Sequence, residues 1–458
     1  MDRHARPRTR LPFGVFLGLW ALLFGLSGAV APAPTAGAAF AGPYYVSPAG
    51  RDTNPGTKTL PWKTIQHAAD RLRAGQTVYI RAGTYPERVR PKYSGTAGHS
   101  ITYIASSGEL PTIDGARVTL PADQAGLFEI NGKAWIRVIG LRVINARPDI
   151  NSYGIFVNRS HDIVVDRNRT SNTRSSGIGV WSSQRVFVRG NDVSKACTGG
   201  YQESITISRT NTFLVENNTV HGITADKEGI TIKQGARNGT VRGNLVHDVT
   251  RVGIYVDAED EVTSGIVVER NVVHHTGYGI QLCTEAGALL QNVRIQNNLT
   301  YENVFWGIAV SRCGIEGIAH PIDAVTIVNN TVWRNGDPWG GGIAVDNPDA
   351  THVVIRNNIV SDNLSWQISV DGAVAPGNVT IDHNLIDGYR ANVGEGEVRG
   401  DASVEGSPLF VDAARGDFHL RTGSPGIDAG SAEGAPATDF SGTARPRGAG
   451  FDIGAFES

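Results

Sequence analysis

Acidic side chains, one lysine and one tyrosine gather in the middle of the chain, in successive stretches of about 25 residues. They are Glu203, Asp226, Glu228, Lys233, Tyr255, Asp257, Glu259 and Glu285. Paired carboxylates can act as general acid and base, and a carboxylate cluster offers the oxygen ligands that calcium prefers. A lysine or tyrosine beside them can move a proton. These residue types therefore predict acid–base or metal-assisted chemistry, provided that the fold brings them together.

An internal repeat indicates how they meet. Between Tyr153 and Gly388, nine short apolar strands recur, with starts 23–35 residues apart, from "GIFVN" (154–158) through "GITIK" (229–233) to "QISVD" (367–371). One asparagine per repeat keeps the same step: Asn168, Asn191, Asn218, Asn244, Asn271, Asn298, Asn330, Asn358 and Asn384. Three short strands per repeat describe a solenoid whose coils hydrogen-bond to the coils above and below. The 3.6-residue period of helical repeats is absent.

Equivalent residues of neighbouring coils should then lie one above the other, about 4.8 Å apart. We expect each repeat asparagine to bond to the next one and to satisfy backbone groups at a buried bend. We expect the glycine that opens most strands to adopt backbone angles that other residues avoid.

Reading the columns predicts which functional side chains are neighbours. Positions are counted from the residue that opens each five-residue strand, such as the glycine of "GITIK" (229–233). The fifth position places Lys233 beside Asp257, and the third places Tyr255 beside Gln281. Two residues beyond the fifth position, Glu259 and Glu285 also lie one coil apart.

A further column consists of the residues just before each strand. It contains Glu203, Glu228, Tyr278 and Trp306, which can face the same groove only if the chain bends at the preceding corner.

Cysteine and histidine positions follow the same columns. Cys283 and Cys313 fall on adjacent coils, offset by two residues, so a disulfide between them is geometrically allowed, and Cys197 is then left over. His221, His247 and His274 form a column that we interpret as a partly solvated ladder in preference to a zinc site.

The asparagine column and the three-strand coil over residues 150–390 resemble the right-handed parallel β-helices of the pectate-lyase-like superfamily. The expected fold is all-β, a single-stranded right-handed parallel β-helix of roughly 9–12 coils. Residues 44–89 resemble the N-terminal segment of extracellular bacterial β-helix proteins. A helix near 62–72, apolar at Ile65, Ala68, Ala69 and Leu72, would close that end of the solenoid. Residues 407–457 resemble the C-terminal segment of similar secreted proteins, a cap for the opposite end or a surface-attachment segment.

The expected organisation is a signal peptide at 1–41, an N-terminal cap and first coils at 42–120, the β-helix at 121–390 and a C-terminal cap or tail at 391–458. The leader combines basic "MDRHARPRTR", a long apolar run and small residues before residue 41. Charge is balanced, with Lys+Arg 42 and Asp+Glu 44. Since no basic stretch suits nucleic acid, we expect a secreted monomer that binds neither nucleic acid nor, after cleavage, a membrane.

The first functional hypothesis is β-elimination on a uronic-acid polysaccharide. The spacing Asp226-x-Glu228-x4-Lys233 is similar to the acidic-x-Glu-x4-Lys arrangement of β-helical lyases that act on alginate and dermatan-type chains. The resemblance implies Asp226 and Glu228 as calcium ligands, with Glu203 as a third, and Lys233 as the base. Those lyases carry an arginine one coil beyond the lysine, where this chain has Asp257. An aspartate there raises the pKa of the lysine, so Tyr255 would have to donate the proton.

The second hypothesis is glycoside hydrolysis by Asp257 and Glu285, whose Cα atoms should lie about 8 Å apart from strand spacing. Glu259 lies beside this pair as a further catalytic candidate, and Lys233 would keep Asp257 ionised while Glu285 stays protonated. Tyr278 and Trp306 could stack on sugar faces in either scheme, next to Gln281. The third hypothesis is a non-catalytic carbohydrate-binding or cell-surface protein.

Overall fold

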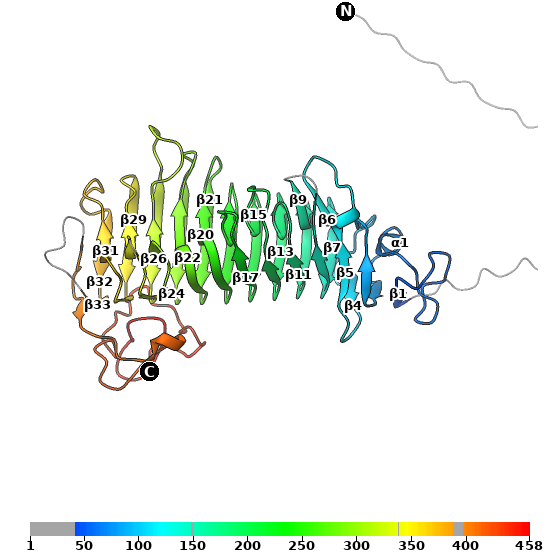
Figure 1. The fold of residues 1–458 in the computed structure, drawn as a ribbon. Coiled ribbons are helices and arrows are strands. Elements are labelled where there is room, and N and C mark those ends of the chain that lie inside the picture. The colour runs from blue at the N-terminus through cyan, green and yellow to red at the C-terminus, as the bar shows by residue number, and fades with distance from the viewer. Residues whose placement is uncertain (1–41, 148–150, 338, 389–396) are drawn as a thin grey trace, which may run out of the picture. The chain divides into compact units, whose positions relative to one another are not determined.

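The computed structural model of the protein describes residues 42–147, 151–337, 339–388 and 397–458 (Figure 1). Their strands stack into a solenoid in which almost every neighbouring pair is parallel, which confirms the predicted all-β parallel β-helix. The predicted leader lies outside the described residues. Within the described part of the chain, no helix is long and apolar enough to cross a membrane.

Two large sheets form the walls of the solenoid, one of 13 strands and one of 21. The first sheet consists of β1 (Tyr44–Val46), β2 (Thr77–Ile80), β4 (Ile101–Ala105), β7 (Ala134–Ile139), β10 (His161–Asp166), β13 (Gln184–Arg189), β16 (Asn211–Glu216), β19 (Arg237–Arg242), β21 (Thr263–Glu269), β23 (Leu290–Gln296), β26 (Ile322–Val328), β29 (Ala350–Arg356) and β32 (Val379–Asp382).

The second sheet consists of β3 (Gly83–Tyr85), β5 (Pro111–Asp114), β6 (Ala125–Asn131), β8 (Arg142–Ile144), β9 (Ser152–Asn158), β11 (Arg169–Ser171), β12 (Ile178–Trp181), β14 (Asp192–Ser194), β15 (Ile205–Ser208), β17 (Thr219–Ile223), β18 (Ile230–Lys233), β20 (Leu245–Asp257), β22 (Val272–Cys283), β24 (Leu299–Tyr301), β25 (Trp306–Val310), β27 (Thr331–Trp333), β28 (Gly341–Val345), β30 (Ile359–Ser361), β31 (Trp366–Val370), β33 (Leu385–Asp387) and β34 (Val404–Glu405). Short elements complete the chain: α1 (Ile65–Ala69), η1 (Gly115–Arg117), η2 (Ala413–Arg415) and the antiparallel pair β35 (Phe410–Asp412) and β36 (Asp417–Leu420).

Columns of identical apolar residues fill the interior. In one column, nine successive coils carry an isoleucine, each fully buried and each in register with the next: Ile155, Ile178, Ile205, Ile230, Ile254, Ile280, Ile308, Ile343 and Ile368. β-branched side chains suit this place because they pack well on a pleated surface, and each stabilises the fold by about 1.5–3 kcal/mol on burial. A shift of one residue would turn the whole column outward, so the pattern determines the register.

The predicted asparagine ladder is present and continuous. The side-chain amide of Asn218 donates to Oδ1 of Asn244 at 2.9 Å and to the carbonyl oxygen of Val188 on the preceding coil at 2.9 Å. Asn244 repeats both bonds, to Asn271 at 2.9 Å and to Val215 at 3.0 Å. The same bonds connect the other repeat asparagines. Each ladder residue is buried, so it satisfies backbone groups that water cannot reach.

The glycines that open the strands have a different role from the predicted one. Gly229, Gly253 and Gly279 do not adopt positive φ. A Cβ added at Gly229 would lie 2.6 Å from the carbonyl oxygen of Gly253, and one at Gly279 would lie 2.3 Å from that of Gly307. Close approach of the next coil excludes a side chain there.

Left-handed conformations occur instead at other turns of the coils, for example directly before ladder asparagines, at Asn217 (φ 54°) and Arg270 (φ 54°).

A second ladder and a ring stack run along other edges. Asn303 donates to Asn335 at 2.8 Å and Asn335 to Asn363 at 2.9 Å, a short asparagine ladder that the repeat pattern had not indicated. The rings of His221, His247 and His274 stack at 5.3 Å from centroid to centroid, which confirms the predicted histidine ladder.

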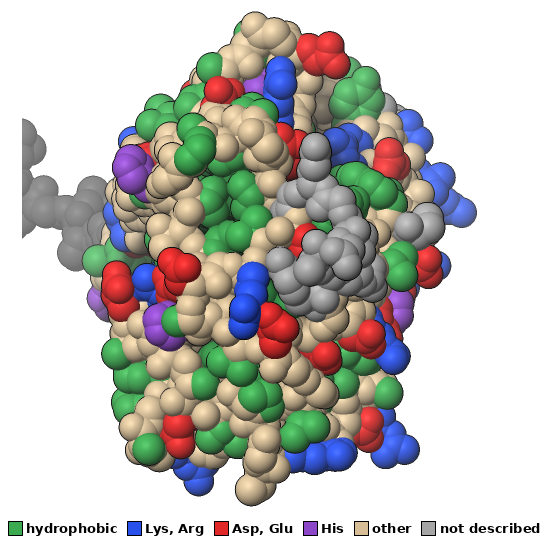
Figure 2. Space-filling view, turned by 90° about the vertical axis from the view of Figure 1, so that its left-hand side faces the viewer, with side chains coloured by type: hydrophobic (Ala, Val, Ile, Leu, Met, Phe, Trp, Pro, Cys, Tyr) green, Lys and Arg blue, Asp and Glu red, His purple; other side chains and the backbone are tan. Residues whose placement is uncertain are grey.

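The two ends of the solenoid differ. At the N-terminal end, α1 buries Ile65, Ala68 and Ala69 in the main core; its role in closing that end stays a prediction. At the other end, a hydrophobic patch lies above the centre of the view, and charged side chains lie both near the centre and around the rim (Figure 2).

The C-terminal segment packs along the flank of the last coils (Figure 1), where the sequence analysis expected a cap or a surface-attachment segment. Asn297 donates to Thr438, Asn329 to Asp452 and Asn357 to Ser431, at 2.8–3.0 Å. These three asparagines immediately precede ladder residues, so the corner of each coil holds the segment in place.

We predict that Asn244→Ala lowers the free energy of unfolding by about 3 kcal/mol, because it leaves buried backbone and amide groups without partners. Chemical denaturation monitored by far-ultraviolet circular dichroism measures the change. Asn211→Ala is the matched control, since its side chain bonds only near the surface, to the exposed Asn238 and Thr212. Equal midpoints for the two variants would contradict a stabilising ladder.

Candidate active site

One pocket of about 270 Å³ on the surface of the second sheet collects most of the predicted residues. It is lined by Gly200, Tyr201, Gln202, Glu203, Lys227, Glu228, Lys233, Arg251, Tyr255, Asp257, Glu259 and Glu285. These residues come from β15, β18, β20 and β22 and the turns beside them. Seven of the eight charged or phenolic residues singled out in the sequence therefore share one site, and Asp226 is the exception.

The strand register brings these side chains together. Thr231 pairs with Tyr255 and Ile232 with Val256, so Lys233 and Asp257 follow as neighbours on adjacent coils. Tyr255 pairs in turn with Gln281, as predicted. Because outward positions alternate along a strand, Tyr255 and Asp257 lie on the same face of β20, two residues apart.

A bend turns the glutamates before the strands toward this pocket. Gln202 and Asp226 adopt left-handed backbone conformations, with φ of 56° and 52°. These corners break the strand alternation immediately before Glu203 and two residues before Glu228. Both glutamates consequently line the pocket instead of pointing into the core.

Lys233 is held by carboxylates on two sides. Its Nζ lies 3.0 Å from Oε1 of Glu203 and 3.8 Å from Oε2 of Glu259. Burial alone would lower the pKa of the lysine, but Glu203 and Glu259 outweigh burial and hold that pKa above its usual value. The ammonium group also lies 5.9 Å from the ring centroid of Trp181. Lys233 is therefore a stable cation in this pocket, which opposes its predicted role as a base.

Glu228 forms the second ion pair. Its Oε1 lies 3.1 Å from Nη1 of Arg251, and its side chain is buried. Burial and the nearby Glu203 raise the pKa of Glu228, although Arg251 partly offsets this rise. Glu228 consequently binds its proton more tightly than an exposed glutamate does.

Asp257 is the most buried carboxyl group of the pocket, with 1% of the residue exposed. Its Oδ1 accepts backbone N–H bonds from Glu259 at 2.8 Å and from Glu285 at 3.1 Å. Burial and the Glu285 carboxylate together raise the pKa of Asp257 to about 7. Asp257 can thus gain or lose a proton near neutral pH, as an efficient acid or base must.

Tyr255 connects this carboxyl group to the edge of the pocket. Its hydroxyl donates to Oε1 of Glu285 at 2.8 Å and lies 3.7 Å from Sγ of Cys313. Burial and the adjacent Asp257 raise the pKa of Tyr255 well above its usual value, so the phenol keeps its proton. Cys313 forms a disulfide with Cys283, with Cα atoms 6.0 Å apart, as the column offset allowed. This bridge joins the two coils beside the pocket, and Cys197 is a buried free thiol.

The predicted calcium ligands do not assemble as a set. Glu203 and Glu228 are already paired with Lys233 and Arg251, while Asp226 is exposed and its backbone N–H donates to Thr250. No group of three His, Cys, Asp or Glu side chains is arranged to hold a metal ion in the part of the chain that the structure describes. The residues present therefore do not fit the ion in this arrangement.

The predicted sugar-binding residues are largely covered. Trp306 is 5% exposed and stacks on Trp366, with ring centroids 5.8 Å apart, and Gln281 is 8% exposed. Tyr278 is half-buried against Phe305. The structure leaves little of the Trp306 ring for a sugar. Trp339, in the long loop after β27, is 50% exposed and contacts Trp306 edge-on.

Sequence reasoning missed three pocket residues. Arg251 directly precedes Val252, and Lys227 directly precedes Glu228, so both adjoin the column that contains Glu203 and Glu228. Tyr201 is exposed at the rim. The resemblance implied an arginine at the position of Asp257. The arginine that lines the pocket is instead Arg251, six residues earlier on the same coil. A search for cations next to the glutamate column would have found it.

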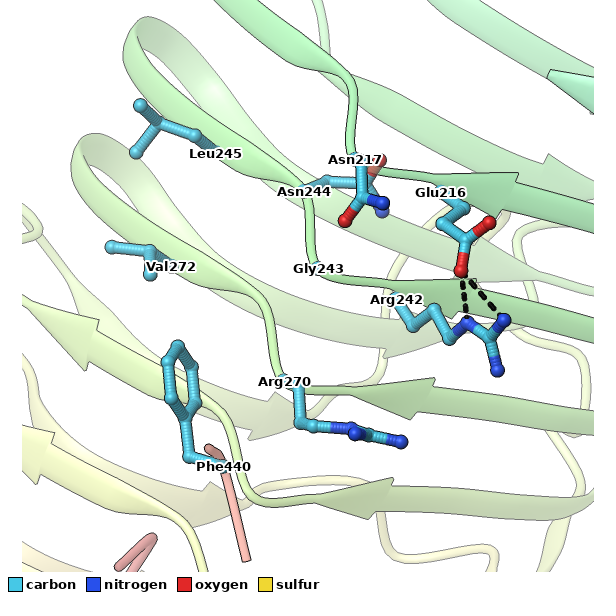
Figure 3. A pocket seen from close by; sticks show the side chains of 9 residues that line it. All are labelled: Glu216, Asn217, Arg242, Gly243, Asn244, Leu245, Arg270, Val272 and Phe440. Atoms are coloured by element: carbon cyan, nitrogen blue, oxygen red, sulfur yellow. Dashed lines mark hydrogen bonds and ion pairs between the residues drawn. The ribbon is translucent and has the colours of Figure 1, made fainter. Parts of the chain in front are cut away.

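A separate pocket of about 500 Å³ lies where the C-terminal segment meets the corner of the coils (Figure 3). Arg242 and Glu216 face each other there at 2.6 Å, and Arg270 and Phe440 lie on another side. Its single carboxylate is bound to an arginine, so this pocket lacks the paired carboxyl groups of the candidate site.

Comparisons with known proteins agree with this architecture. Residues 44–244 match the family model described as Pel9A-like, right handed beta helix region. The crystal structure of pectate lyase Pel9A superposes with a TM-score of 0.56 at 17% identity, covering 90% of this chain and 96% of that chain. A likeness at this level of identity shows the fold.

Two curated proteins are similar in sequence. The uncharacterized protein YwoF of Bacillus subtilis (strain 168) is 26% identical over 438 residues, which cover 83% of this chain and 91% of the relative. Pectate lyase PEL9 of Emericella nidulans is 31% identical over 151 residues, which cover 31% of this chain and 36% of that protein. The family match ends at residue 244, so it includes Glu203, Glu228 and Lys233 and stops before Arg251, Asp257 and Glu285.

We predict that the free energy of unfolding falls as the pH rises from about 4 to about 7, because folded Asp257, with its raised pKa, retains a proton that the unfolded chain releases. Asp257→Asn should remove up to about 4 kcal/mol of this decrease. Denaturant unfolding at several pH values measures it. Glu261→Gln is the control, because Glu261 forms an exposed ion pair with Arg209. If the free energy of unfolding depends on pH equally in the wild type and in Asp257→Asn, the raised pKa of Asp257 is contradicted.

Proposed function

We propose that the chain, a parallel β-helix whose residues 44–244 match a Pel9A-like family model, cleaves an acidic polysaccharide in the pocket around Asp257. The observation that carries this proposal is the composition of that pocket. Five carboxyl groups, three cations and two tyrosines from successive coils meet in one hollow, where burial and Glu285 raise the pKa of Asp257 to about 7. Structural ion pairs alone would not need so many buried like charges, whose desolvation is costly.

The cations suit a negatively charged sugar. Lys227, Lys233 and Arg251 line the pocket. Lys227 forms no ion pair with the described residues, whereas Lys233 and Arg251 would add a uronate carboxylate to the ion pairs they already make with Glu203 and Glu228. When Asp257 and Glu228 are protonated, three carboxylates face three cations and the pocket is neutral. Substrate binding should therefore strengthen as the pH falls through about 7, where Asp257 gains its proton.

β-elimination is the first candidate reaction. Two comparisons favour it: part of the chain is similar in sequence to a pectate lyase, and the matching family model includes the positions of Glu203, Glu228 and Lys233. In this reaction Lys233 or Arg251 pairs with the sugar carboxylate. Ionised Asp257 removes the proton next to that carboxylate, and the electron pair of the C–H bond forms the double bond as the C–O bond breaks. The hydroxyl of Tyr255 gives its proton to the leaving oxygen, and Glu285 orients that hydroxyl.

Hydrolysis is the second candidate, favoured by the proximity of Asp257 and Glu285. The backbone N–H of Glu285 donates to Oδ1 of Asp257 at 3.1 Å, and the Glu285 carboxylate contributes to the raised pKa of Asp257. Here protonated Asp257 donates to the leaving oxygen, and the Glu285 carboxylate assists water or attacks the sugar carbon. This assignment reverses the one expected from sequence, in which Asp257 was ionised, because burial keeps the proton on Asp257.

We predict that Asp257→Asn and Glu285→Gln each reduce cleavage by at least about 100-fold, as expected for loss of an acid or base. Wild type and variants are incubated with polygalacturonate, alginate and a neutral glucan, and the new reducing ends are counted. Asp260→Asn is the control, because Asp260 is exposed beside the pocket. Full activity in both test variants would move the site elsewhere, and no cleavage of any acidic polymer would favour the non-catalytic alternative.

The pH profile and the products should separate the two reactions. Elimination needs ionised Asp257, so its rate at saturating substrate should rise as the pH passes upward through about 7, and the products should carry ultraviolet-absorbing unsaturated ends. Hydrolysis needs protonated Asp257, so its rate should fall over the same range, and the new ends should be saturated. A profile that Asp257→Asn leaves unchanged would contradict both schemes.

Calcium, which the sequence resemblance implies, is not part of these steps. We predict that cleavage persists in excess chelator, since Glu203 and Glu228 are paired with cations of the chain and Asp226 lies outside the pocket. Activity assays with chelator, and then with added calcium, measure this. Loss of activity that calcium alone restores would contradict the expectation.

Export of the chain, expected from residues 1–41, remains part of this proposal and suits a polymeric substrate outside the cell. Processing at that segment can be tested by determining the N-terminus of the protein recovered from culture medium.

A further inference from the structure

A basic pocket of about 510 Å³ lies near the N-terminal end of the solenoid, apart from the candidate active site. Its lining residues are Gln66, Asp70, Arg88, Arg90, Pro91, Lys92, Glu129, Asn131 and Lys133. Four cations and two carboxylates leave it with a net charge of +2, in a chain whose total is −2. Nothing in the proposed reaction uses this pocket.

Part of this positive charge is available to a ligand. The carboxylate of Glu129 is shared by Arg88, which contacts it directly, and by Arg90, at 3.8 Å. Lys92 and Lys133 form no ion pair with a carboxylate of the described residues. Arg90 and Lys92 are exposed, so an anion in the pocket could reach them without displacing a protein group.

The pocket lies on the same columns as the candidate active site. Val89 pairs with Phe128, which places Arg90 beside Glu129. Glu129 pairs with Phe156, and the column continues through Gly179, Thr206 and Thr231 to Tyr255. These five coil-to-coil steps place Glu129 about 24 Å from Tyr255 along the solenoid.

One column of strand positions connects the two pockets. The fifth-position column runs from Asn131 through Asn158, Trp181 and Ser208 to Lys233. Asn131 and Asn158 are partly exposed, whereas Trp181 and Ser208 are buried, so a polymer could contact this column near its ends and would pass over its middle. A linear polymer along this column would extend from one pocket to the other over several sugar units.

We propose that the basic pocket binds a uronate carboxylate of the same polysaccharide, several sugars away from the bond that is cleaved. The substrate class rests on the proposed function, whereas binding in this pocket does not require cleavage. Such a contact would favour long chains over short ones and determine where along a chain the cut is made.

The test uses Asp257→Asn as the background, so that binding is measured without cleavage. Arg90→Ala, Lys92→Ala and Lys133→Ala are combined; Arg88 stays because it neutralises the buried Glu129. The matched control combines Arg51→Ala, Lys58→Ala and Lys63→Ala, three exposed cations outside the pocket. The affinity of each variant is measured for long chains of polygalacturonate and alginate and for their di- and trisaccharides, at low and high salt. Thermal unfolding midpoints check that the variants fold.

We expect the triple variant to bind long acidic chains about tenfold or more weakly than the control, with a smaller salt dependence, and to bind short oligosaccharides equally well. Equal affinity of the two triple variants for long chains would overturn the inference, as would an equal loss for short oligosaccharides. If the pocket variant weakens binding while the wild-type protein cleaves no polymer, the inference stands and the proposed function fails.

Discussion

The buried asparagine ladder imposes the geometry on which the other features of this protein depend. Each amide spans from one coil to the next and also reaches a carbonyl group of the preceding coil. A coil that slipped by one residue would leave several such groups unpaired in the interior and would turn its isoleucine outward. The spacing between coils is therefore nearly constant, and residues about 25 positions apart become neighbours at strand distance.

This regular stack allows the chain to concentrate charge in one place. Glu203, Glu228 and Asp257 come from three successive coils and share one pocket, where each would be costly alone. Two of them meet a cation of the chain, and Asp257 accepts two backbone N–H groups. Burial and repulsion by the Glu285 carboxylate outweigh these backbone hydrogen bonds, so Asp257 keeps its proton up to near neutral pH. The stability of the ladder and the core permits a site that by itself opposes folding.

The same stack produces a long flat face with pockets at intervals. Positions in one column are equivalent in geometry but differ in side chain, so basic, aromatic, polar and acidic groups follow one another along the solenoid axis. A linear polymer is the kind of ligand that such a face can contact at several places at once. Weak contacts then add along its length.

The coil can be predicted from the sequence, because periodic isoleucine, valine and asparagine residues indicate both the register and the inward face. The sequence also determined which functional residues become neighbours, since Lys233, Tyr255, Asp257 and Glu285 follow from that register alone. The protonation state of each residue, and which further side chains reach the pocket, depend on tertiary contacts. The left-handed corners at Gln202 and Asp226 turned two glutamates into it, Arg251 entered from an unmarked position, and Trp306 was covered by other rings. Burial and the nearest opposite charge set a pKa, and both depend on side-chain directions and loop paths that no periodic pattern encodes.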